Sequence, residues 1–188
     1  MNSPLRACVQ RHFVARRLLT LGGALEGRTA LEVGCGRGVG IEIILRVFHA
    51  EHVDAFDLDQ HMMDLAGRRS ARHRDAVSIW TGDACSIPKP DASYDAVFDF
   101  GIVHHIPARR QAISEIHRVL KPQGRFYAEE IFGHLIDGFP WRHLAKHPTE
   151  DRFDAAGFAE GLAGAGFDVR KSMSFAGCFG WFIADKKE

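Results

Sequence analysis

A glycine-rich stretch that follows a short apolar run constrains this chain more than any other feature. In Leu31–Gly40, with the sequence LEVGCGRGVG, glycine occupies every second position from Gly34 onward. The apolar residues before it predict a buried strand, and the amphipathic run at 41–48 predicts a helix. Glycine allows positive φ and lets a ligand lie against the backbone. A helix N-terminus offers unpaired N–H groups to an anionic group, so the stretch predicts a strand, a ligand-binding loop and a helix.

The spacing of these glycines does not fit the dinucleotide fingerprint G-x-G-x-x-G. Counted from Gly34, the third glycine of that fingerprint falls on Val39, and counted from Gly36 it falls on Ile41. The pattern that does fit is E-x-G-x-G-x-G, which begins at Glu32. A glycine loop alone is also compatible with a tight turn that binds nothing, so the rest of the chain has to decide.

Length and composition predict one domain. The chain has 188 residues and 24 basic against 24 acidic side chains, which gives a formal net charge of +0. We expect residues 1–188 to form a single domain, and the balanced charge does not point to nucleic acid or an acidic membrane as a partner. No apolar run approaches the roughly 20 residues of a membrane span. The four cysteines are scattered without a C-x-x-C pair, which favours free thiols and a cytoplasmic protein.

The N-terminal residues 1–25 predict an amphipathic helix with a basic face. No acidic residue precedes Glu26. The arginines of this segment are Arg6, Arg11, Arg16 and Arg17. A targeting peptide is also basic, but this segment lacks the apolar core and the small-residue cleavage site of a secretory signal. We therefore expect a helix at 5–20 that ends at Gly22-Gly23.

The rest of the chain alternates predicted strands with predicted helices. The strands are 29–33, 52–57, 77–80, 94–100 and 125–131, and the helices are 38–48, 60–72, 108–120 and 154–165. Lys121–Gly124 predicts the helix stop before the fifth strand. Such alternation implies right-handed crossovers and a mostly parallel α/β sheet. Two further strands, 167–175 and 179–185, have no helix between them and predict an antiparallel hairpin at the sheet edge.

Acidic residues stand at or just after the carboxyl ends of three predicted strands, where open α/β sheets bind ligands. They are Asp57, Asp83 and Asp99. Asp57 could accept hydrogen bonds from ribose hydroxyls, with Asp59 as the competing candidate. Leu58 would then pack on an adenine face, and Asp83 with the N–H of Ala84 would bind the adenine edge. Each acid taken singly is equally compatible with a solvated strand end.

Five motifs fall in the order and spacing of a known family. They are Leu31–Gly38, Asp57-Leu58, Gly82-Asp83-Ala84, Tyr94-Asp95-Ala96-Val97 and Glu115–Gly124. Together they resemble class I S-adenosylmethionine-dependent methyltransferases, in particular the small-molecule branch that includes type 11 and ubiquinone/menaquinone-type enzymes. The resemblance covers about residues 29–131 and includes His104-His105-Ile106. Two positions depart from it, because Gln123 replaces the usual glycine and Phe100-Gly101 replaces a more polar pair.

The resemblance implies a Rossmann-like, seven-stranded, mostly parallel sheet with helices on both faces, a C-terminal antiparallel hairpin and the strand order 3-2-1-4-5-7-6. It implies S-adenosylmethionine as methyl donor and S-adenosylhomocysteine as product. The cofactor-binding positions of the family fall on Glu32, Gly34, Cys35, Gly36, Gly38, Asp57, Leu58, Asp83, Ala84, Asp99 and Phe100. Phe100 would offer the methionine amino group its backbone carbonyl rather than a polar side chain.

Four residues near the ends of the fourth and fifth strands are candidates for the acceptor side. His104 and His105 are the candidate catalytic bases, since imidazole removes protons near neutral pH; the alternative is a structural role in the loop. Glu129 and Glu130 end the fifth strand, and alternation sends them to opposite sides. We expect both glutamates to be exposed.

The segment 132–150 is long and rich in aromatic residues, which is unusual for a connection and often functional. It could be a lid over the acceptor, whose walls would be Phe132, Phe139 and Trp141, or a short helix packed on the sheet. His143 and His147 have the i, i+4 spacing of metal ligands, but no third ligand has a clear place, so we expect no metal site.

The motifs favour methyl transfer to a small-molecule acceptor with an apolar or aromatic part. An enzyme that methylates nucleic acid or protein is the first alternative, although Asp99–Ile102 lacks the two prolines of amino-methylating nucleic-acid enzymes. A module that binds S-adenosylmethionine without transferring the methyl group is the second alternative. A Rossmann oxidoreductase that binds NAD is the third. The sequence does not indicate the accepting atom or the oligomeric state.

Overall fold

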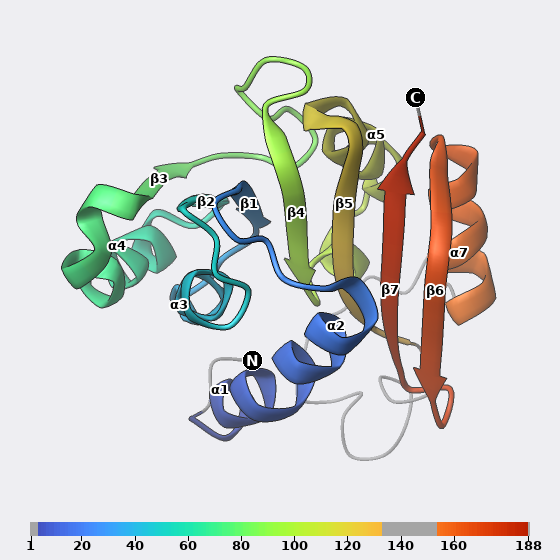
Figure 1. Ribbon diagram of the computed structural model, residues 1–188, viewed down its shortest axis with the longest axis horizontal. Coiled ribbons are helices and arrows are strands. Elements are labelled where there is room, and N and C mark those ends of the chain that lie inside the picture. The colour runs from blue at the N-terminus through green and yellow to red at the C-terminus, as the bar shows by residue number, and fades with distance from the viewer. Residues whose placement is uncertain (1–3, 133–153, 188) are drawn as a thin grey trace.

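Seven strands form one sheet through the middle of the molecule, in the order β3-β2-β1-β4-β5-β7-β6 (Figure 1). This computed structural model describes residues 4–132 and 154–187. The strands are β1 Thr29–Val33, β2 His52–Asp57, β3 Val77–Thr81, β4 Tyr94–Phe100, β5 Leu120–Ile131, β6 Phe167–Phe175 and β7 Phe179–Lys186. The first five pair in parallel, and β7 runs antiparallel to both β5 and β6. The predicted fold class and strand order are therefore confirmed.

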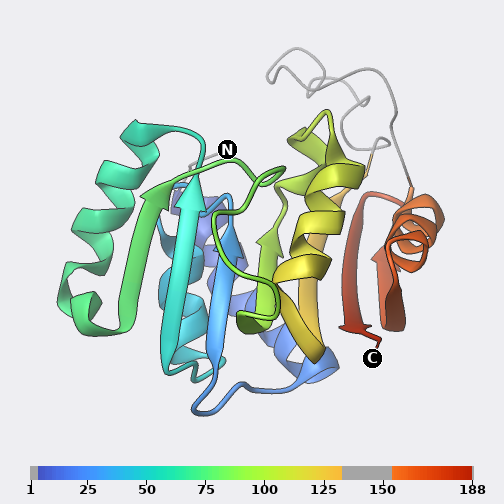
Figure 2. The same ribbon diagram turned by 90° about the horizontal axis from the view of Figure 1, so that it is seen from above.

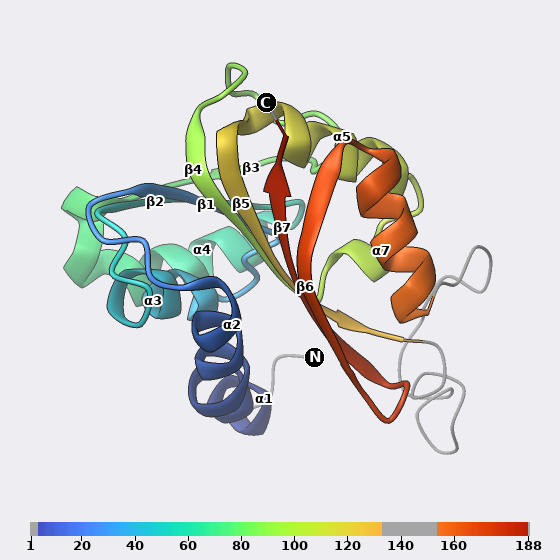
Figure 3. The same ribbon diagram turned by 45° about the vertical axis from the view of Figure 1, so that its right-hand side comes forward.

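Helices cover both faces of the sheet, as its mostly parallel strands require. They are α1 Pro4–Val9, the π-helical turn η1 Gln10–Val14, α2 Ala15–Gly22, α3 Val39–Arg46, α4 Gln60–Ser70, α5 Arg109–Val119 and α7 Ala155–Gly164, with 3₁₀ turns η2 Ala71–Ala76 and η3 Val103–His105. Helices α2, α3 and α4 pack on one face, and α5 and α7 pack on the other (Figures 2 and 3). None of the helices within residues 4–132 and 154–187 has the length and hydropathy of a membrane span.

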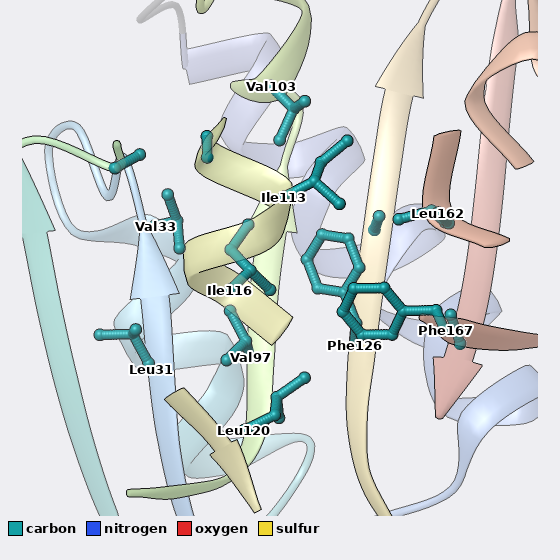
Figure 4. Close-up of a cluster of buried hydrophobic side chains, with 14 of the residues drawn as sticks. Leu31, Val33, Val97, Val103, Ile113, Ile116, Leu120, Phe126, Leu162 and Phe167 are labelled. Atoms are coloured by element: carbon teal, nitrogen blue, oxygen red, sulfur yellow. The ribbon is translucent and has the colours of Figure 1, made fainter. Parts of the chain in front are cut away.

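The strands divide their side chains between two hydrophobic clusters. In β4, Val97 points to the cluster under α5, whereas Phe98 points to the opposite cluster under α2 and α3. Figure 4 shows the α5 cluster, in which Ile113 and Ile116 lie over the strands and Phe126 faces the β6 side. This alternation explains why the strands read as continuous apolar runs, since both faces are buried.

The start of β5 differs from the sequence prediction. The helix does stop at Val119, but strand pairing already begins with Leu120 opposite Tyr94, and the register shifts before Arg125 pairs with Ala96. Gln123 lies inside this irregular stretch with φ of 61°, the left-handed region that glycine adopts most easily. The departure from the family's glycine therefore leaves the turn in place, with a non-glycine residue in a glycine conformation.

Helix α2 docks on β5 and β7 through a position that has room only for glycine. The hydroxyl of Tyr127 donates to the carbonyl oxygen of Gly22 over 3.0 Å. A Cβ atom at Gly22 would overlap the Tyr127 ring and lie 2.8 Å from Ile183. Gly161 in α7 is a matched contrast, because a Cβ there would meet no atom within 4 Å.

We predict that the same substitution has opposite effects at these two glycines. Gly22→Ala should lower the free energy of unfolding by about 1–3 kcal/mol through overpacking. Gly161→Ala should raise it by roughly 0.5–1 kcal/mol, because alanine loses less conformational entropy in a helix. Denaturant unfolding followed by circular dichroism measures both. A Gly22→Ala variant as stable as the wild type would contradict the docking of α2 on Tyr127.

Candidate active site

The loop between β1 and α3 has the conformation that its glycines predict. Gly34, Gly36 and Gly38 all have positive φ, at 64°, 51° and 74°. Packing also requires two of them to lack a side chain, because a Cβ atom on Gly34 would overlap Ile102 and one on Gly38 would lie 3.1 Å from the backbone of Ala66. The loop therefore follows a tight path between β4 and α4 and leads directly into the N-terminus of α3.

Asp57 lies against this loop at the end of β2. Its Oδ2 accepts a hydrogen bond from the Gly36 N–H over 2.8 Å, and its Oδ1 accepts one from the Asp59 N–H over 3.0 Å. The competing candidate Asp59 instead caps α4, where its Oδ1 accepts from the His61 N–H over 2.8 Å. Of the two acids, only Asp57 is brought to the glycine loop.

The ends of β2 and β3 present a second pair of predicted residues. Leu58 is 75% exposed, which is unusual for a leucine and leaves an apolar surface beside Asp57. Gly82 donates its N–H to the Asp57 carbonyl oxygen over 3.0 Å and so ties the end of β3 to that of β2. Asp83 is exposed and accepts from the Cys85 N–H over 2.8 Å, whereas Ala84 is buried.

Glu32 in β1 is a buried carboxylate with an unsatisfied oxygen. Its exposed fraction is 2%, and its Oε2 has no hydrogen-bond partner. Burial raises the pKa of Glu32 well above its ordinary value, and the nearby Asp57 and Asp99 raise it further. A Cβ atom at Gly40 would overlap this carboxylate, so the last glycine of the motif gives Glu32 its space. Such a group favours an incoming ligand that brings positive charge or hydrogen-bond donors.

Cys35 contributes its backbone rather than its thiol to the loop. The side chain is buried, with Sγ 3.8 Å from Met63 Sδ, and burial raises the thiol pKa. A thiol in this state is not a nucleophile. The Cys35 N–H donates to the Phe56 carbonyl oxygen over 2.9 Å, and the Cys35 carbonyl oxygen accepts from the Gly38 N–H over 2.9 Å, so this residue shapes the loop.

Two buried carboxyl groups lie at the ends of β4 and β5. Asp99 and Glu130 are both fully buried, and Asp99 Oδ2 and Glu130 Oε1 have no hydrogen-bond donor among the described residues. Repulsion between two carboxylates in a buried site favours the protonated form of one of them. Burial raises the pKa of Asp99 well above its ordinary value and that of Glu130 to about 7. The other oxygen of Asp99 accepts from the Ile102 N–H over 2.7 Å.

His104 is the next member of this network. Its Nδ1 lies 2.6 Å from Glu130 Oε2, and its side chain is 5% exposed. Burial lowers the pKa of His104, with Arg6 acting in the same direction and Asp99 and Glu129 opposing it. The His105 ring lies beside it, with ring centroids 4.1 Å apart. Glu130 therefore orients the His104 ring.

Arg6 reaches this edge from the N-terminal helix. It forms an ion pair of 2.9 Å with Glu129 Oε2, and a further hydrogen bond of 3.4 Å joins it to the Phe100 carbonyl oxygen. Gly101 has φ of 81°, and a Cβ there would lie 3.2 Å from Arg6 and 3.7 Å from His104. The Phe100-Gly101 departure from the family pattern therefore makes room for Arg6.

Two expectations about the end of the fifth strand are wrong. Glu129 and Glu130 are buried rather than exposed, because α1 and η3 cover the strand end from the two sides. Phe132 is also buried, with its N–H bonded to the Cys178 carbonyl and its ring packed against Phe182, so it belongs to the core and not to an acceptor wall. The other proposed lid and metal positions, Phe139, Trp141, His143 and His147, lie outside the described residues.

Arg6 is not among the site residues that the sequence predicts, although one signal for it was present. The first 25 residues contain four arginines and no acid, so their partners had to come from elsewhere in the chain. Nothing in that pattern identifies Glu129, which is 123 residues away along the sequence. In the part of the chain that the structure describes, no group of three or more His, Cys, Asp or Glu residues is arranged to hold a metal ion.

A family model described as "Methyltransferase domain" matches residues 31–128, which is more than half of the chain. The chain belongs to the class I S-adenosylmethionine-dependent methyltransferases. The match begins in β1 at Leu31 and ends in β5 at Ala128, so it includes every strand end from β1 to β4 described above.

Individual relatives and structures agree with this assignment. A Mycolicibacterium smegmatis protein named "Probable S-adenosylmethionine-dependent methyltransferase" is 34% identical over 148 residues, which are 78% of this chain and 54% of that protein. The "Phthiotriol/phenolphthiotriol dimycocerosates methyltransferase" of Mycobacterium tuberculosis is 36% identical over 150 residues, which are 79% of this chain and 54% of the relative. The chain thus spans about half the length of these curated relatives. The structure of an Aquifex aeolicus S-adenosylmethionine-dependent methyltransferase superposes with a TM-score of 0.78 at 20% identity, covering 98% of this chain and 94% of that one.

S-adenosylmethionine, the cofactor of the family, fits the residues present. The positively charged methionyl end suits the unpartnered Glu32 carboxylate oxygen beside the glycine loop. Asp57 still has lone pairs for ribose hydroxyls, since each of its oxygens accepts one backbone hydrogen bond. Leu58 provides an exposed apolar surface for an adenine ring.

We predict that Asp57→Ala weakens binding of S-adenosylhomocysteine by about 1–3 kcal/mol, because donors on the ribose and on Gly36 lose their acceptor. Asp59→Ala is the matched control. It should keep the affinity and instead lose roughly 1 kcal/mol of stability with the α4 cap. Titration calorimetry and thermal unfolding separate the two effects. Equal affinity of the wild type and a folded Asp57→Ala variant would rule out the ribose role.

Proposed function

We propose that this domain transfers the methyl group of S-adenosylmethionine to a small-molecule acceptor with an apolar part. The observation that carries the proposal is the His104–Glu130 pair, which lies just beyond the end of β4, at the same edge of the sheet as the glycine loop that follows β1. One half of this edge fits the donor, and the other half holds an oriented imidazole. An arrangement of this kind suits an acceptor that has to lose a proton.

The donor itself supplies much of the chemical activation. When bound, S-adenosylmethionine provides a methyl group on a positively charged sulfur, which is already a good leaving group. The work left to this chain is to align the acceptor and to take its proton. Asp99 is buried, interacts with Glu130 and accepts a hydrogen bond from the Ile102 N–H. Its role is therefore to stabilise the conformation of the chain at the end of β4.

We assign the proton transfer to His104. A neutral imidazole that donates its Nδ1–H to Glu130 has its basic lone pair on Nε2, and this nitrogen would accept the proton of the acceptor. The imidazolium that results would be stabilised by Glu130, with Asp99 and Glu129 acting in the same direction. Arg6 opposes that charge, and its ion pair with Glu129 limits the effect.

Two features support an apolar acceptor. Ile102 and Ile106 are partly buried apolar residues on either side of His104. One relative is named for methylation of phthiotriol and phenolphthiotriol dimycocerosates. Methylation of nucleic acid or protein remains the alternative enzyme function, and it would require a larger open surface at this edge. Family membership sets aside the NAD-dependent oxidoreductase.

We also propose that residues 1–188 act as one domain and that the protein is cytoplasmic. All seven described strands belong to one sheet, which supports the single domain. Cys8, Cys35, Cys85 and Cys178 are all free thiols, which supports a reducing compartment.

The deciding experiment for this function is transfer of a radiolabelled methyl group from S-adenosylmethionine to a panel of small alcohols, phenols, carboxylic acids and amines that carry an apolar chain. Labelled product with one acceptor class would support the proposal. Binding of S-adenosylhomocysteine without transfer to any class would favour the non-catalytic module, and transfer to RNA or protein would favour the alternative enzyme.

We predict that His104→Gln lowers kcat about 100-fold or more, because the acceptor loses its general base. His105→Gln, the neighbouring control, should retain most of the activity. Both variants should bind S-adenosylhomocysteine like the wild type, which calorimetry would verify. Full turnover in both variants would mean that methyl transfer here depends on alignment alone.

The pH dependence of kcat provides a separate test of the same residue. Burial lowers the pKa of His104 from its ordinary value of 6.5, so the folded enzyme keeps this base neutral to lower pH. The acid limb that belongs to His104 should therefore lie below pH 6.5. This acid limb should be absent from the residual activity of His104→Gln. A limb that persists unchanged would assign it to another group.

A further inference from the structure

Exposed apolar side chains gather on two elements that are far apart in sequence. Six large apolar side chains are exposed among the described residues, and all except Leu58 belong to the N-terminal helix or to the β6–β7 hairpin. These five, which we call the apolar face, are Leu5, Val9, Phe13, Met173 and Phe175. Leu5 and Phe175 are the most exposed of them, at 73% and 66%. Clustering of this kind marks an interaction surface more often than scattered exposed residues do.

A set of ring contacts joins the two elements into one surface. Phe13 packs edge-on against Trp181 of β7, with ring centroids 5.6 Å apart. Met173 stands directly opposite Trp181 in the hairpin register, and Phe175 stands opposite Phe179, so these side chains share one side of the hairpin. Both α1 and the hairpin tip extend toward the same end of the molecule (Figures 1 and 3).

The surroundings of the apolar face are basic, although the whole chain is neutral. Neither 4–25 nor 169–183 contains an aspartate or glutamate. The basic residues of these two segments are Arg6, Arg11, His12, Arg16, Arg17, Arg170 and Lys171. Arg17 lies over the rings of Phe13 and Trp181, at 5.6 and 5.9 Å from their centroids, and Lys171 donates to a backbone carbonyl. Neither of these contacts neutralises the positive charge. Arg6, Arg11 and Arg170 form ion pairs with Glu129, Glu42 and Asp168, so the excess positive charge near the apolar face comes from Arg16, Arg17 and Lys171.

We propose that the apolar face docks on an anionic lipid surface. A basic amphipathic helix that places apolar side chains in the acyl boundary and cationic groups at the headgroups binds in this way. The side chains here project from a helix and a hairpin tip, and a lipid layer accepts such projections without a complementary groove. Leucine, valine and methionine have no stacking role on nucleic acid, so these residues favour lipid over RNA.

This surface borders the proposed active site. Arg6 belongs to the same helix as Leu5 and Val9, and it contacts Glu129 and the Phe100 carbonyl oxygen at the strand ends. A protein docked through the apolar face would therefore present that edge close to the lipid layer. Entry of an apolar acceptor from the lipid layer rests on the proposed function. Docking of the protein on the layer does not depend on that function.

The test is co-sedimentation of the full chain with vesicles of phosphatidylcholine alone and of phosphatidylcholine mixed with phosphatidylglycerol. The protein should bind the phosphatidylglycerol vesicles, and added salt should weaken the binding. The double variant Leu5→Ser/Phe175→Ser should lower the bound fraction on the order of tenfold, because it removes the two most exposed apolar groups of the face. Leu58→Ser is the matched apolar control and should bind vesicles like the wild type.

Charge is tested by a second pair of variants. Arg16→Glu/Arg17→Glu should abolish the preference for phosphatidylglycerol, whereas Arg46→Glu, at the far end of α3, should retain it. Failure of the wild type to bind phosphatidylglycerol vesicles would overturn the proposal. So would unchanged vesicle binding of Leu5→Ser/Phe175→Ser, since the apolar face would then be irrelevant.

Two other occupants of the face are distinguished by further measurements. Light scattering that shows a dimer, dissociated by Leu5→Ser/Phe175→Ser, would overturn the proposal in favour of a second copy of this chain. Single-stranded RNA that displaces the protein from vesicles and fails to bind Arg16→Glu/Arg17→Glu would overturn it in favour of nucleic acid. Binding of S-adenosylhomocysteine is measured on every sample, so that loss of the docking and loss of the proposed function are seen independently.

Discussion

Buried negative charge at the carboxyl ends of β1, β4 and β5 is the constraint around which this edge of the molecule is arranged. The four acids there are Glu32, Asp99, Glu129 and Glu130. A carboxylate removed from water requires a cation, a donor or a proton. Glu129 has Arg6, Glu130 has His104, and Asp99 accepts a hydrogen bond from the Ile102 N–H. Glu32 receives a hydrogen bond from the Ile41 N–H and keeps one oxygen unsatisfied.

Because these buried acids are compensated in different ways, the two parts of this sheet edge suit different molecules, the methyl donor and the acceptor. Glu32, which has no cationic partner among the described residues, stands beside the glycine loop, whereas Glu129 and Glu130 are paired with Arg6 and His104. The α1 helix and the η3 turn cover the part of this edge around His104 and exclude water from it. Exclusion of water strengthens the electrostatic interaction between His104 and Glu130. The ion pair from α1 couples this covering to the N-terminal helix, so the helix is part of the edge and not an appendage to the fold.

Sequence pattern was sufficient for the sheet because each strand and helix has a local periodicity. The strand ends at Val33, Asp57 and Phe100 were correctly predicted, and the glycine loop followed from residue type alone. The burial of Glu129 and Glu130 could not be predicted in this way. Alternation along a strand gives the face of each side chain, but it does not reveal that α1 folds back over a strand end more than a hundred residues later.

The same limit applies to Phe132 and to the basic N-terminal segment. An isolated aromatic residue after a strand has no periodic neighbours, so its place in the core depends on contacts with Phe182 and Cys178 from a different part of the chain. Net charge was similarly uninformative, because a neutral total conceals a basic segment at one end. The charge of one surface, summed over the elements that form it, is the quantity that indicates which partners can bind there.

The π-helical turn η1, Gln10–Val14, sets the rotational phase of everything that precedes it. A π turn holds one residue more than an α-helical turn, and one residue corresponds to about 100° of rotation around the helix axis. Without it, α2 could still pack through Leu18, but Arg6 would face away from Glu129 and Leu5 would turn with it. Deletion of a single residue here would therefore rotate α1 about its own axis relative to α2. A change in chain length of this kind could redirect the helix in a related protein while the sheet and its cofactor loop stay as they are.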